Sequence, residues 1–286
     1  MKKYLCILLV CVFLFGCGCT AAPEAQHVSG WTLEDETSSE VADGVTYLQR
    51  TYMDEDDSPH RVYLLFLDPE KVTLKTGTSN NGFDLMPAHR QTVKEHAQAA
   101  VNSGVNVLAA VNGDFFAIES TYMPIGLSVK DGVIIRLNSN NRPYCAVTKD
   151  GEYLISRGAL DPVDVITLDM AVGGSHVLVR EGEIQAQNPN NSFGITPAPR
   201  TLSGETPDGT IILAVIDGRQ PGFSTGATLE QCAQLMHSLG AESAINHDGG
   251  GSSTFLLRSG EDFQVMNRPS DGSLRRVFCS ILVAKK

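Results

Sequence analysis

Short apolar runs separated by Gly, Asn and Pro turns dominate the chain and predict a protein built mainly of β-strands. Two further stretches, 91–102 and 229–238, space their apolar residues as amphipathic helices do, and Thr228 and Gly240 are expected to cap the second. The pattern predicts an α+β fold of mixed, largely antiparallel sheets with a few helices packed outside. The runs expected to be strands are 45–52, 61–67, 71–75, 106–111, 125–129, 133–137, 144–148, 153–156, 210–216, 243–246, 253–257, 263–266 and 277–283.

Residues 1–16 have the pattern of an export signal. A positively charged start precedes an apolar run at 4–15, which is shorter than the roughly 20 residues that cross a bilayer. The segment 14–17, Leu-Phe-Gly-Cys, resembles a bacterial lipobox, so we expect cleavage after residue 16 and attachment of lipid to Cys17. The protein would then be extracytoplasmic and anchored to the cell membrane. An ordinary signal peptide with incidental cysteines is the alternative.

Residues 17–44 are small, polar and acidic, which predicts a disordered tether between the anchor and a domain at 45–286. That domain contains Cys145, Cys232 and Cys279. Three widely spaced cysteines do not form a disulfide framework. We therefore expect them to be small, buried and unpaired side chains.

The net charge of the chain disfavours some classes of binding partner. It carries 22 Lys and Arg residues against 33 Asp and Glu residues, and its net charge of −11 disfavours binding to nucleic acid. The histidines have no zinc-binding spacing, and no Cys-x-x-Cys pair lies in the domain. No cofactor is therefore certain, although a divalent cation of the calcium type could bind the acidic run at 54–57. A solvated hairpin loop is the other interpretation of that run.

One pattern occurs twice along the chain: a helix, a glycine, an apolar strand and then Asn-x-Asp. The first copy ends at residues 112–114 and the second at residues 246–248. Polar side chains at the end of a buried strand have fixed positions at the edge of the sheet. We therefore expect both strand ends to contribute to a site.

The segment 246–254, Asn-His-Asp-Gly-Gly-Gly-Ser-Ser-Thr, is the densest in polar groups. Its glycine amides and hydroxyls could hold an anion, and a plain tight turn is the alternative. Asp217 and Arg219 follow a predicted strand and suit acid–base chemistry beside a phosphate, unless they form only a surface ion pair. Arg200 closes a long irregular loop at 187–199, where it either clamps an anion or is merely solvated.

Five short motifs occur in a fixed order. They are NGDFF at 112–116, PRT at 199–201, DGR at 217–219, STGATL at 224–229 and NHDGGGSST at 246–254. Together they resemble the phosphodiester glycosidase family, and the similarity spans roughly residues 90–284. The resemblance implies hydrolysis of sugar-1-phosphodiester linkages in cell-envelope or exopolysaccharide glycans. A non-catalytic glycan-binding envelope lipoprotein is the rival interpretation.

The implied reaction divides the candidate residues into two groups. A phosphate leaving group needs charge stabilisation, and the developing oxocarbenium ion needs a nearby carboxylate. The carboxylates expected to be catalytic are Asp217, Asp248 and, third, Asp114. The residues expected to bind the substrate are Asn112, Gly113, Arg200, Gly218, Arg219, Asn246, Gly249, Gly250, Gly251, Ser252, Ser253 and Arg268.

Overall fold

The structure is a computed structural model that describes residues 28–83, 90–137, 141–156 and 164–286. The expected export signal and the lipidation site at Cys17 lie outside these residues. Within the described ranges, no helix has the length and apolar character needed to cross a membrane. The predictions of export and lipid anchoring therefore stay predictions.

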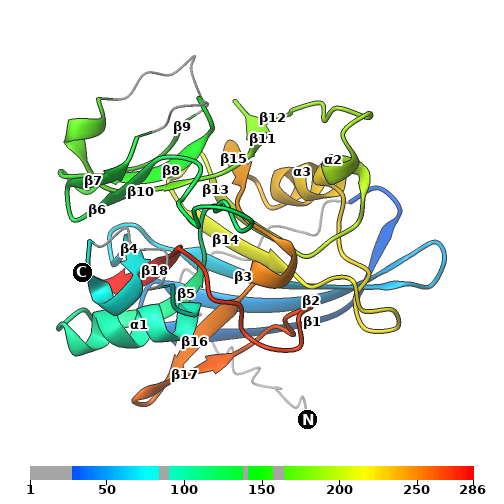
Figure 1. Ribbon diagram of the computed structural model, residues 1–286. Helices are drawn as coiled ribbons and strands as arrows, with labels where there is room; N and C mark the ends of the chain where they lie inside the picture. Colours follow the sequence, from blue (N-terminus) through cyan, green and yellow to red (C-terminus); the bar gives the residue numbers. More distant parts are fainter. Residues whose placement is uncertain (1–27, 84–89, 138–140, 157–163) are drawn as a thin grey trace, which may run out of the picture.

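The strands of the described chain form three antiparallel sheets (Figure 1). Sheet one has the order β1 (Trp31–Ala42), β2 (Val45–Asp54), β3 (Pro59–Leu67), β14 (Ile211–Ile216), β13 (Arg200–Glu205), β15 (Ser243–Asn246), β11 (His176–Arg180) and β12 (Glu183–Ile184). Sheet two has the order β7 (Val133–Arg136), β6 (Ser128–Lys130), β10 (Leu168–Gly173), β8 (Tyr144–Thr148) and β9 (Tyr153–Ser156). Sheet three has the order β17 (Asp262–Val265), β16 (Phe255–Ser259), β5 (Val107–Asn112), β18 (Cys279–Lys285) and β4 (Val72–Thr78).

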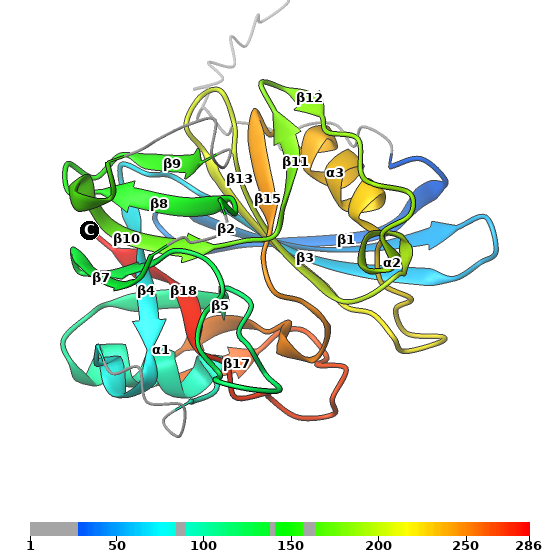
Figure 2. The same cartoon turned by 45° about the horizontal axis from the view of Figure 1, so that its top comes forward.

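Helices cover the outside of these sheets (Figure 2). Thr228 accepts a hydrogen bond from the Gln231 backbone at the start of the second long helix, and Gly240 follows its end with φ at +84°. Both predicted caps are confirmed, as is the α+β fold class. The helices are α1 (Val93–Asn102), α2 (Ser192–Ile195) and α3 (Leu229–Ser238), with short 3₁₀ helices η1 (Ser79–Asn81), η3 (Val165–Thr167) and η4 (Gly250–Ser252).

The expected tether at 17–44 is wrong where the structure describes it. Residues 31–42 form β1, which pairs along its length with β2 at the edge of sheet one. Most side chains of β1 are exposed, but Trp31 is only 4% exposed and stacks on His60, with ring centroids 4.1 Å apart. A polar strand is therefore held by its backbone pairing and one aromatic anchor, and the fold includes residues before 45.

Besides β1, four strands were not expected from the sequence: β10, β11, β12 and β13. The last of these matters for the site, because Arg200 is its first residue and lies in sheet one rather than in a loop. The cysteine prediction is confirmed: Cys145, Cys232 and Cys279 are buried and unpaired.

The largest hydrophobic core cluster contains residues of all three sheets and packs sheet one against sheet three. Tyr63 and Leu65 of β3 belong to the same buried cluster as Val111 of β5 and Phe255 of β16. A second cluster lies beneath α3 and includes Leu202. Two sheets held by one core place the ends of their strands at a common junction.

Strand ends from both sheets meet at this junction. In sheet one, β13 pairs antiparallel with β14 and β15, so Arg200 lies opposite Ile216, and Leu202 lies opposite Asn246. In sheet three, β5 ends at Asn112 and pairs with β16, which directly follows the polar segment 246–254. The motifs predicted from the sequence thus come together at the junction of two sheets.

Candidate active site

Asn112 joins the two sheets at the junction. Its side-chain amide donates a hydrogen bond to the Asp248 carbonyl at 2.7 Å. Its side-chain oxygen accepts bonds from the Thr201 hydroxyl at 2.6 Å and from the Thr254 backbone N–H at 3.1 Å. Asn112 is fully buried, and these bonds occupy its amide group, so it holds the strand ends in place rather than reaching a ligand.

Asn246, the matching residue of the second copy, is also fully buried. Its amide nitrogen donates to the Ser175 hydroxyl at 2.9 Å and to the His247 carbonyl at 2.6 Å. The adjacent residue, His247, forms hydrogen bonds through its imidazole ring to Ser203 and to the Gly173 carbonyl. Burial lowers the pKa of this ring to about 4. Both Asn-x-Asp turns are therefore fixed by buried asparagines, and a neutral histidine supports the second.

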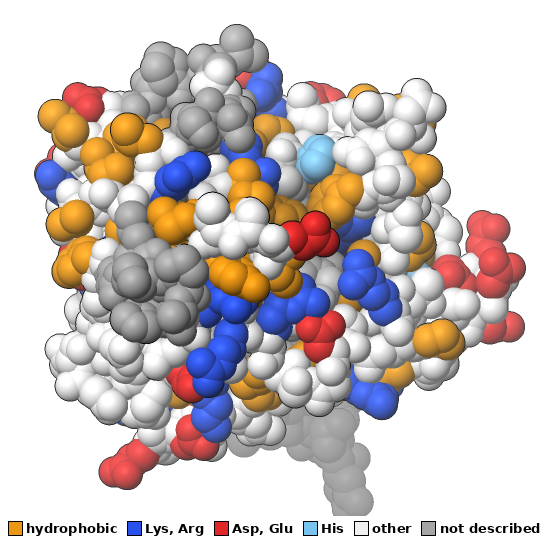
Figure 3. Space-filling model, in the orientation of Figure 1, with side chains coloured by type: hydrophobic (Ala, Val, Ile, Leu, Met, Phe, Trp, Pro, Cys, Tyr) orange, Lys and Arg blue, Asp and Glu red, His pale blue; other side chains and the backbone are white. Residues whose placement is uncertain are grey.

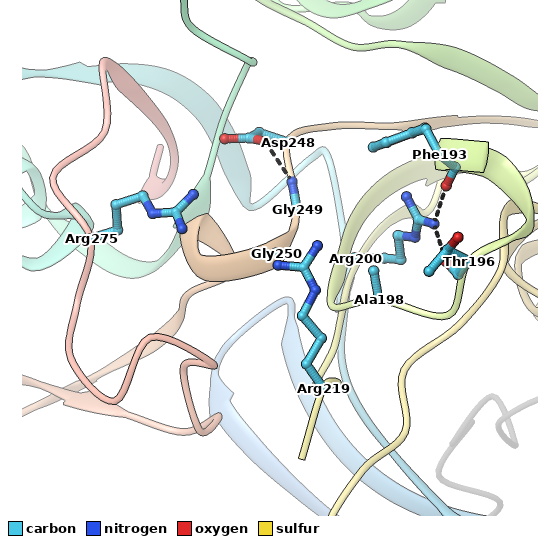
Figure 4. A pocket seen from close by; sticks show the side chains of 9 residues that line it. All are labelled: Phe193, Thr196, Ala198, Arg200, Arg219, Asp248, Gly249, Gly250 and Arg275. Carbon is cyan, nitrogen blue, oxygen red and sulfur yellow. Dashed lines mark hydrogen bonds between the residues drawn. The ribbon is translucent and has the colours of Figure 1, made fainter. Parts of the chain in front are cut away.

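A pocket of about 240 Å³ opens beside these turns (Figure 4). It lies between the α2 loop, the start of β13 and the loops that follow β14 and β15, and the chain before β18 closes the remaining side. Its volume is below the range of about 300–1,000 Å³ common for drug-sized ligands, so it suits a single compact group. The lining residues are Phe193, Thr196, Ala198, Arg200, Arg219, Asp248, Gly249, Gly250 and Arg275.

Asp248 is the carboxylate of this pocket. One of its oxygens accepts the Gly249 backbone N–H at 2.8 Å, and the Ser252 hydroxyl is a second hydrogen-bond partner. Burial raises the pKa of Asp248 to about 6, although those hydrogen bonds and the nearby charge of Arg275 act in the opposite direction. A carboxyl group with this pKa exchanges protons near neutral pH.

Asp114 is 1% exposed and lies close enough to Asp248 for their charges to interact. Its carboxylate accepts the Gly126 backbone N–H at 2.6 Å, and its second oxygen lies 3.8 Å from a guanidinium nitrogen of Arg142. Burial raises the pKa of Asp114 to about 7, against the effect of Arg142, and the charge of Asp248 raises it further. Two carboxyl groups that influence each other in this way favour one ionised and one protonated member.

The pocket arginines differ in how many hydrogen bonds their side chains form with the protein. Arg200 donates to the carbonyls of Ala227, Phe193 and Thr196 at 2.7–3.0 Å, which ties β13 to the α2 loop. Burial lowers the pKa of Arg200, and the charge of Arg219 lowers it further. The two cations therefore repel each other across the pocket, and a bound anion would relieve that repulsion.

Arg219 and Arg275 complete the positive wall. Among the residues that the structure describes, the Arg219 guanidinium has no hydrogen-bond or ion-pair partner, and its backbone has φ at +60°. A non-glycine residue in this conformation is strained, which is common at binding sites. Arg275 forms an ion pair with Asp271, with nitrogen–oxygen distances of 2.7 and 2.8 Å. Arg219 is thus the pocket cation most available to a ligand.

The consecutive glycines are required for steric reasons rather than as an anion cradle. The Gly249 N–H bonds to Asp248, and the Gly250 N–H donates to the Pro199 carbonyl at 2.9 Å. A Cβ atom on Gly249 would lie 2.4 Å from that carbonyl oxygen, and one on Gly250 would lie 3.0 Å from the Arg219 guanidinium. These two amides are therefore not available, and the positive charge of the pocket comes from side chains.

Asp217 does not line the pocket, contrary to expectation. It is buried, and its carboxylate accepts hydrogen bonds from the Tyr63 hydroxyl at 3.1 Å, the Asn267 amide at 2.9 Å and the Arg268 backbone N–H at 2.8 Å. Burial raises its pKa, and these bonds act in the opposite direction. Asp217 therefore connects the end of β14 to the 267–268 turn.

The other predicted binding residues have mixed placements. Gly113 and Gly218 allow close packing, because a Cβ on either would lie within 3 Å of a neighbouring atom. Ser252 accepts a long bond of 3.4 Å from Arg275 at the pocket edge, while Ser253 is buried. The side chain of Arg268 is exposed and lies outside the pocket.

Five residues of the site were missed by the sequence interpretation. Four of them line the pocket, and the fifth faces Asp114. Three belong to the irregular loop at 187–199, whose length was the one available signal. The missed residues are Phe193, Thr196, Ala198, Arg275 and Arg142.

No group of three or more His, Cys, Asp or Glu side chains suited to a metal ion occurs in the part of the chain that the structure describes. The acidic run at 54–57 lies at the end of β2 and in the turn to β3, and Asp54 bonds to His60 at 3.1 Å. The geometry therefore gives the calcium alternative no support at this turn.

A partly buried carboxyl group with a raised pKa beside a cluster of arginines is an arrangement suited to hydrolysis next to an anion. The family model for phosphodiester glycosidases matches residues 105–284, so the chain belongs to the phosphodiester glycosidase family. Membership supports a glycosidase-type hydrolase. The predicted family resemblance is confirmed.

One curated relative is the mouse N-acetylglucosamine-1-phosphodiester alpha-N-acetylglucosaminidase. It is 29% identical over 186 residues, which cover 59% of this chain and 34% of the mouse protein. The aligned part is thus about a third of the relative's length. The alignment therefore does not assign the activity of the whole mouse protein to this chain.

Three solved structures share the fold. The catalytic domain of the zebrafish N-acetylglucosamine-1-phosphodiester alpha-N-acetylglucosaminidase, auto-inhibited by its pro-peptide, has a TM-score of 0.66, 21% identity and 89% coverage of both chains. A hypothetical protein from Synechocystis has a TM-score of 0.65 and 17% identity, with 90% of this chain and 68% of that chain covered. A putative exported protein from Burkholderia pseudomallei has a TM-score of 0.65 and 16% identity, with coverages of 92% and 99%.

Proposed function

We propose that the protein hydrolyses the bond between the anomeric carbon of a sugar and a phosphodiester, in glycans outside the cytoplasm. The products would be the free sugar and a phosphomonoester. The observation that carries this proposal is the convergence of Asp248 with Arg200 and Arg219 on one pocket. Membership of the phosphodiester glycosidase family supports the same chemistry.

The arginines would bind and stabilise the departing phosphate. A phosphate monoester has a second pKa of about 6, so it leaves readily and needs charge stabilisation more than a strong acid. Arg219 has no partner among the described residues and would contact the phosphate directly. Arg200 is held in place by three carbonyls and contributes positive charge from a fixed position.

Asp248 would act on the sugar side of the bond. When ionised, it stabilises positive charge at the anomeric carbon and either attacks that carbon or takes a proton from the attacking water. Asp114 is buried nearby and, with a pKa raised to about 7, stays mostly protonated while Asp248 ionises. Asp114 is therefore a positioning residue that sets the charge of the pair.

The rival function, glycan binding without catalysis, has less support from the pocket. Sugar-binding grooves are commonly lined by aromatic side chains, and Phe193 is the one aromatic residue lining this pocket. A carboxyl group with a pKa raised to about 6 has no evident use in simple binding but is suited to catalysis.

The extracytoplasmic setting is part of the proposal and rests on the sequence of residues 1–17. If Cys17 carries lipid, the full chain will partition with membranes and incorporate labelled palmitate. The variant Cys17→Ser should lose both properties. Palmitate incorporation at the same level in the variant would contradict the predicted anchor.

The function is tested by incubating the full chain with a panel of sugar-1-phosphodiesters and identifying the products. We expect free sugar and a phosphomonoester from at least one substrate, and loss of this activity in Asp248→Asn. The release of sugar-1-phosphate would instead mean that the far P–O bond was broken and that the protein is a phosphodiesterase. A fragment starting at residue 45 should not be used, because it lacks β1.

A further inference from the structure

We propose that Arg61 and Arg268, which both stack on Phe223, form a second anion-binding site next to the pocket. This site would bind another phosphate of the same substrate chain, so that the preferred substrate is a glycan with repeated phosphodiester linkages. The inference rests on the proposed function and adds a substrate class to it.

Arg61, Arg268 and Phe223 form what we call the clamp, in which both guanidinium groups lie against one aromatic ring. The guanidinium carbon of Arg61 lies 4.6 Å from the centroid of the Phe223 ring, and that of Arg268 lies 4.9 Å from it. Neither guanidinium has a hydrogen bond or ion pair within the described ranges, and the Nε of Arg61 is buried without a partner. Two cations held on one ring repel each other unless an anion lies between or beside them.

Backbone bonds fix the positions of both arginines. The Arg61 N–H donates to the Ser224 hydroxyl oxygen at 3.0 Å, and that hydroxyl donates to the Asp217 carbonyl at 2.6 Å. The Arg268 N–H donates to the Asp217 carboxylate at 2.8 Å. Asp217 therefore connects the two arginine backbones, although its carboxylate lies outside the pocket. The charge of Arg61 also lowers the pKa of Asp217.

The clamp lies one turn away from the pocket. Arg219 lines the pocket, and its neighbour Gln220 begins a turn in which the Phe223 N–H donates to the Gln220 carbonyl at 2.9 Å. The ends of such a turn lie within about 7 Å of each other. The Gln220 amide also donates to the Arg268 carbonyl at 2.8 Å. The Phe223 ring thus belongs to the turn that directly follows Arg219. In the proposal, a chain with one phosphate at Arg219 places another phosphate near this ring.

The charge distribution favours a narrow polyanion over a nucleic acid or an anionic membrane. The whole chain has a net charge of −11, which repels extended anionic surfaces. Figure 3 shows Lys and Arg side chains gathered over the middle of one face, and a group of Asp and Glu side chains at its right margin. The acidic run at 54–57 also lies close in sequence to Arg61. The proposal therefore commits to a flexible glycan phosphate, which is narrow enough to follow the Lys and Arg side chains in the middle of this face.

The proposal is tested by comparing two substrates of the same sugar. One contains a single sugar-1-phosphodiester, and the other is a synthetic oligomer joined through several phosphodiesters. In the double variant Arg61→Gln/Arg268→Gln, the ratio of kcat/KM for the oligomer to that for the single unit should fall about tenfold. The control is Arg136→Gln on β7, which removes one positive charge elsewhere and should leave the ratio unchanged. An unchanged ratio in the double variant, or the same fall in the control, would overturn the proposal.

Binding measurements separate the possible sources of the anion. The probes are the oligomer, inorganic phosphate, and vesicles of phosphatidylglycerol and phosphatidylcholine. We expect the double variant to lose affinity for the oligomer about tenfold and to change little toward the other probes. An equal loss for inorganic phosphate would mean a site for free phosphate, and a loss confined to vesicles would mean a lipid-binding surface. Either result contradicts a second site for the substrate chain.

Separate controls distinguish a failure of the clamp proposal from misfolding of the variants and from failure of the proposed hydrolytic function. Arg268 is exposed, so Arg268→Gln alone should keep the melting temperature of the wild type and reproduce part of the effect. If the wild type cleaves neither substrate, the proposed function fails. The oligomer-binding measurement still decides whether the clamp exists, because it needs no turnover.

Discussion

Asp217 and Asp248 each follow a buried strand and precede a glycine, yet the fold places their carboxylates in different surroundings. Asp217 accepts three hydrogen bonds from protein groups and is closed off from the pocket. Asp248 lines the pocket and faces its arginines. A carboxylate at a strand end is therefore structural or catalytic according to how many of its acceptor positions the fold already occupies.

The same contrast separates two pocket arginines. Arg200 donates to three carbonyls, and Arg219 has no partner in the part of the chain that the structure describes. The occupied members, Asp217 and Arg200, should support stability. The less fully bonded members, Asp248 and Arg219, should support the reaction.

The largest expected effect comes from the two aspartates. Asp248→Asn should lower kcat by about 10²–10⁴-fold with little change in melting temperature, because it removes the reacting carboxylate but few packing contacts. Asp217→Asn should cost about 1–3 kcal/mol of stability, because the new amide cannot accept all three hydrogen bonds. Steady-state kinetics and thermal melts on both variants measure this. The comparison fails if Asp217→Asn, measured per folded molecule, loses as much kcat as Asp248→Asn.

The arginines should give the next largest effect. Arg219→Gln should lower kcat/KM by about 10²–10³-fold without destabilising the protein, since one preorganised donor to the developing charge is lost. Arg200→Gln should also lower the melting temperature, because the carbonyls of Ala227, Phe193 and Thr196 lose their donor. The control is Arg219→Lys, which keeps the charge and should recover part of the activity. Equal melting temperatures for both glutamine variants would contradict the assignment.

The pH dependence tests the carboxyl pair. Activity should fall as the pH drops below about 6, because Asp248 becomes protonated, and fall again above about 7, because ionised Asp114 adds negative charge beside the phosphate. In Asp114→Asn, the decline above pH 7 should disappear while the acid limb stays. A profile of kcat/KM against pH for both proteins measures this. An unchanged alkaline limb in the variant would show that Asp114 does not set the charge of the site.

A smaller effect is expected on stability. The folded protein raises the pKa of Asp114 above its ordinary value of 3.8, so the proton is held more tightly in the folded state than in the unfolded state. This contribution to stability is full below about pH 4 and is lost as the pH rises through about 7. The melting temperature of Asp114→Asn relative to the wild type should therefore rise across that window. A constant difference between the two proteins would argue against the raised pKa.

The parts of the fold that local rules determine were predictable. The helix at 229–238 was predicted with its boundaries and caps, because Thr228 and Gly240 act on their immediate neighbours. β1 was not, since its polar residues are ordered by pairing with β2 and by the burial of Trp31. Pairing between strands is not visible in the composition of either strand alone.

The site was predictable as a set of motifs but not as a set of roles. Asp217 and Asp248 look alike in sequence, and what separates them is Tyr63 and Asn267, which lie 154 and 50 residues from Asp217 along the chain. Arg275 likewise enters the pocket from a distant segment. Such partners come together only through the tertiary fold, so the distinction required the structure.

The most direct test of the account follows the oxygen atom supplied by water. The full chain is incubated with a sugar-1-phosphodiester in ¹⁸O-labelled water, and the products are analysed by mass spectrometry. Attack at the anomeric carbon, as proposed for the Asp248 pocket, places the label in the free sugar and leaves the phosphomonoester unlabelled. Label in the phosphomonoester would mean attack at phosphorus, and the assignment of Asp248 and Arg219 to glycosidic cleavage would then be wrong.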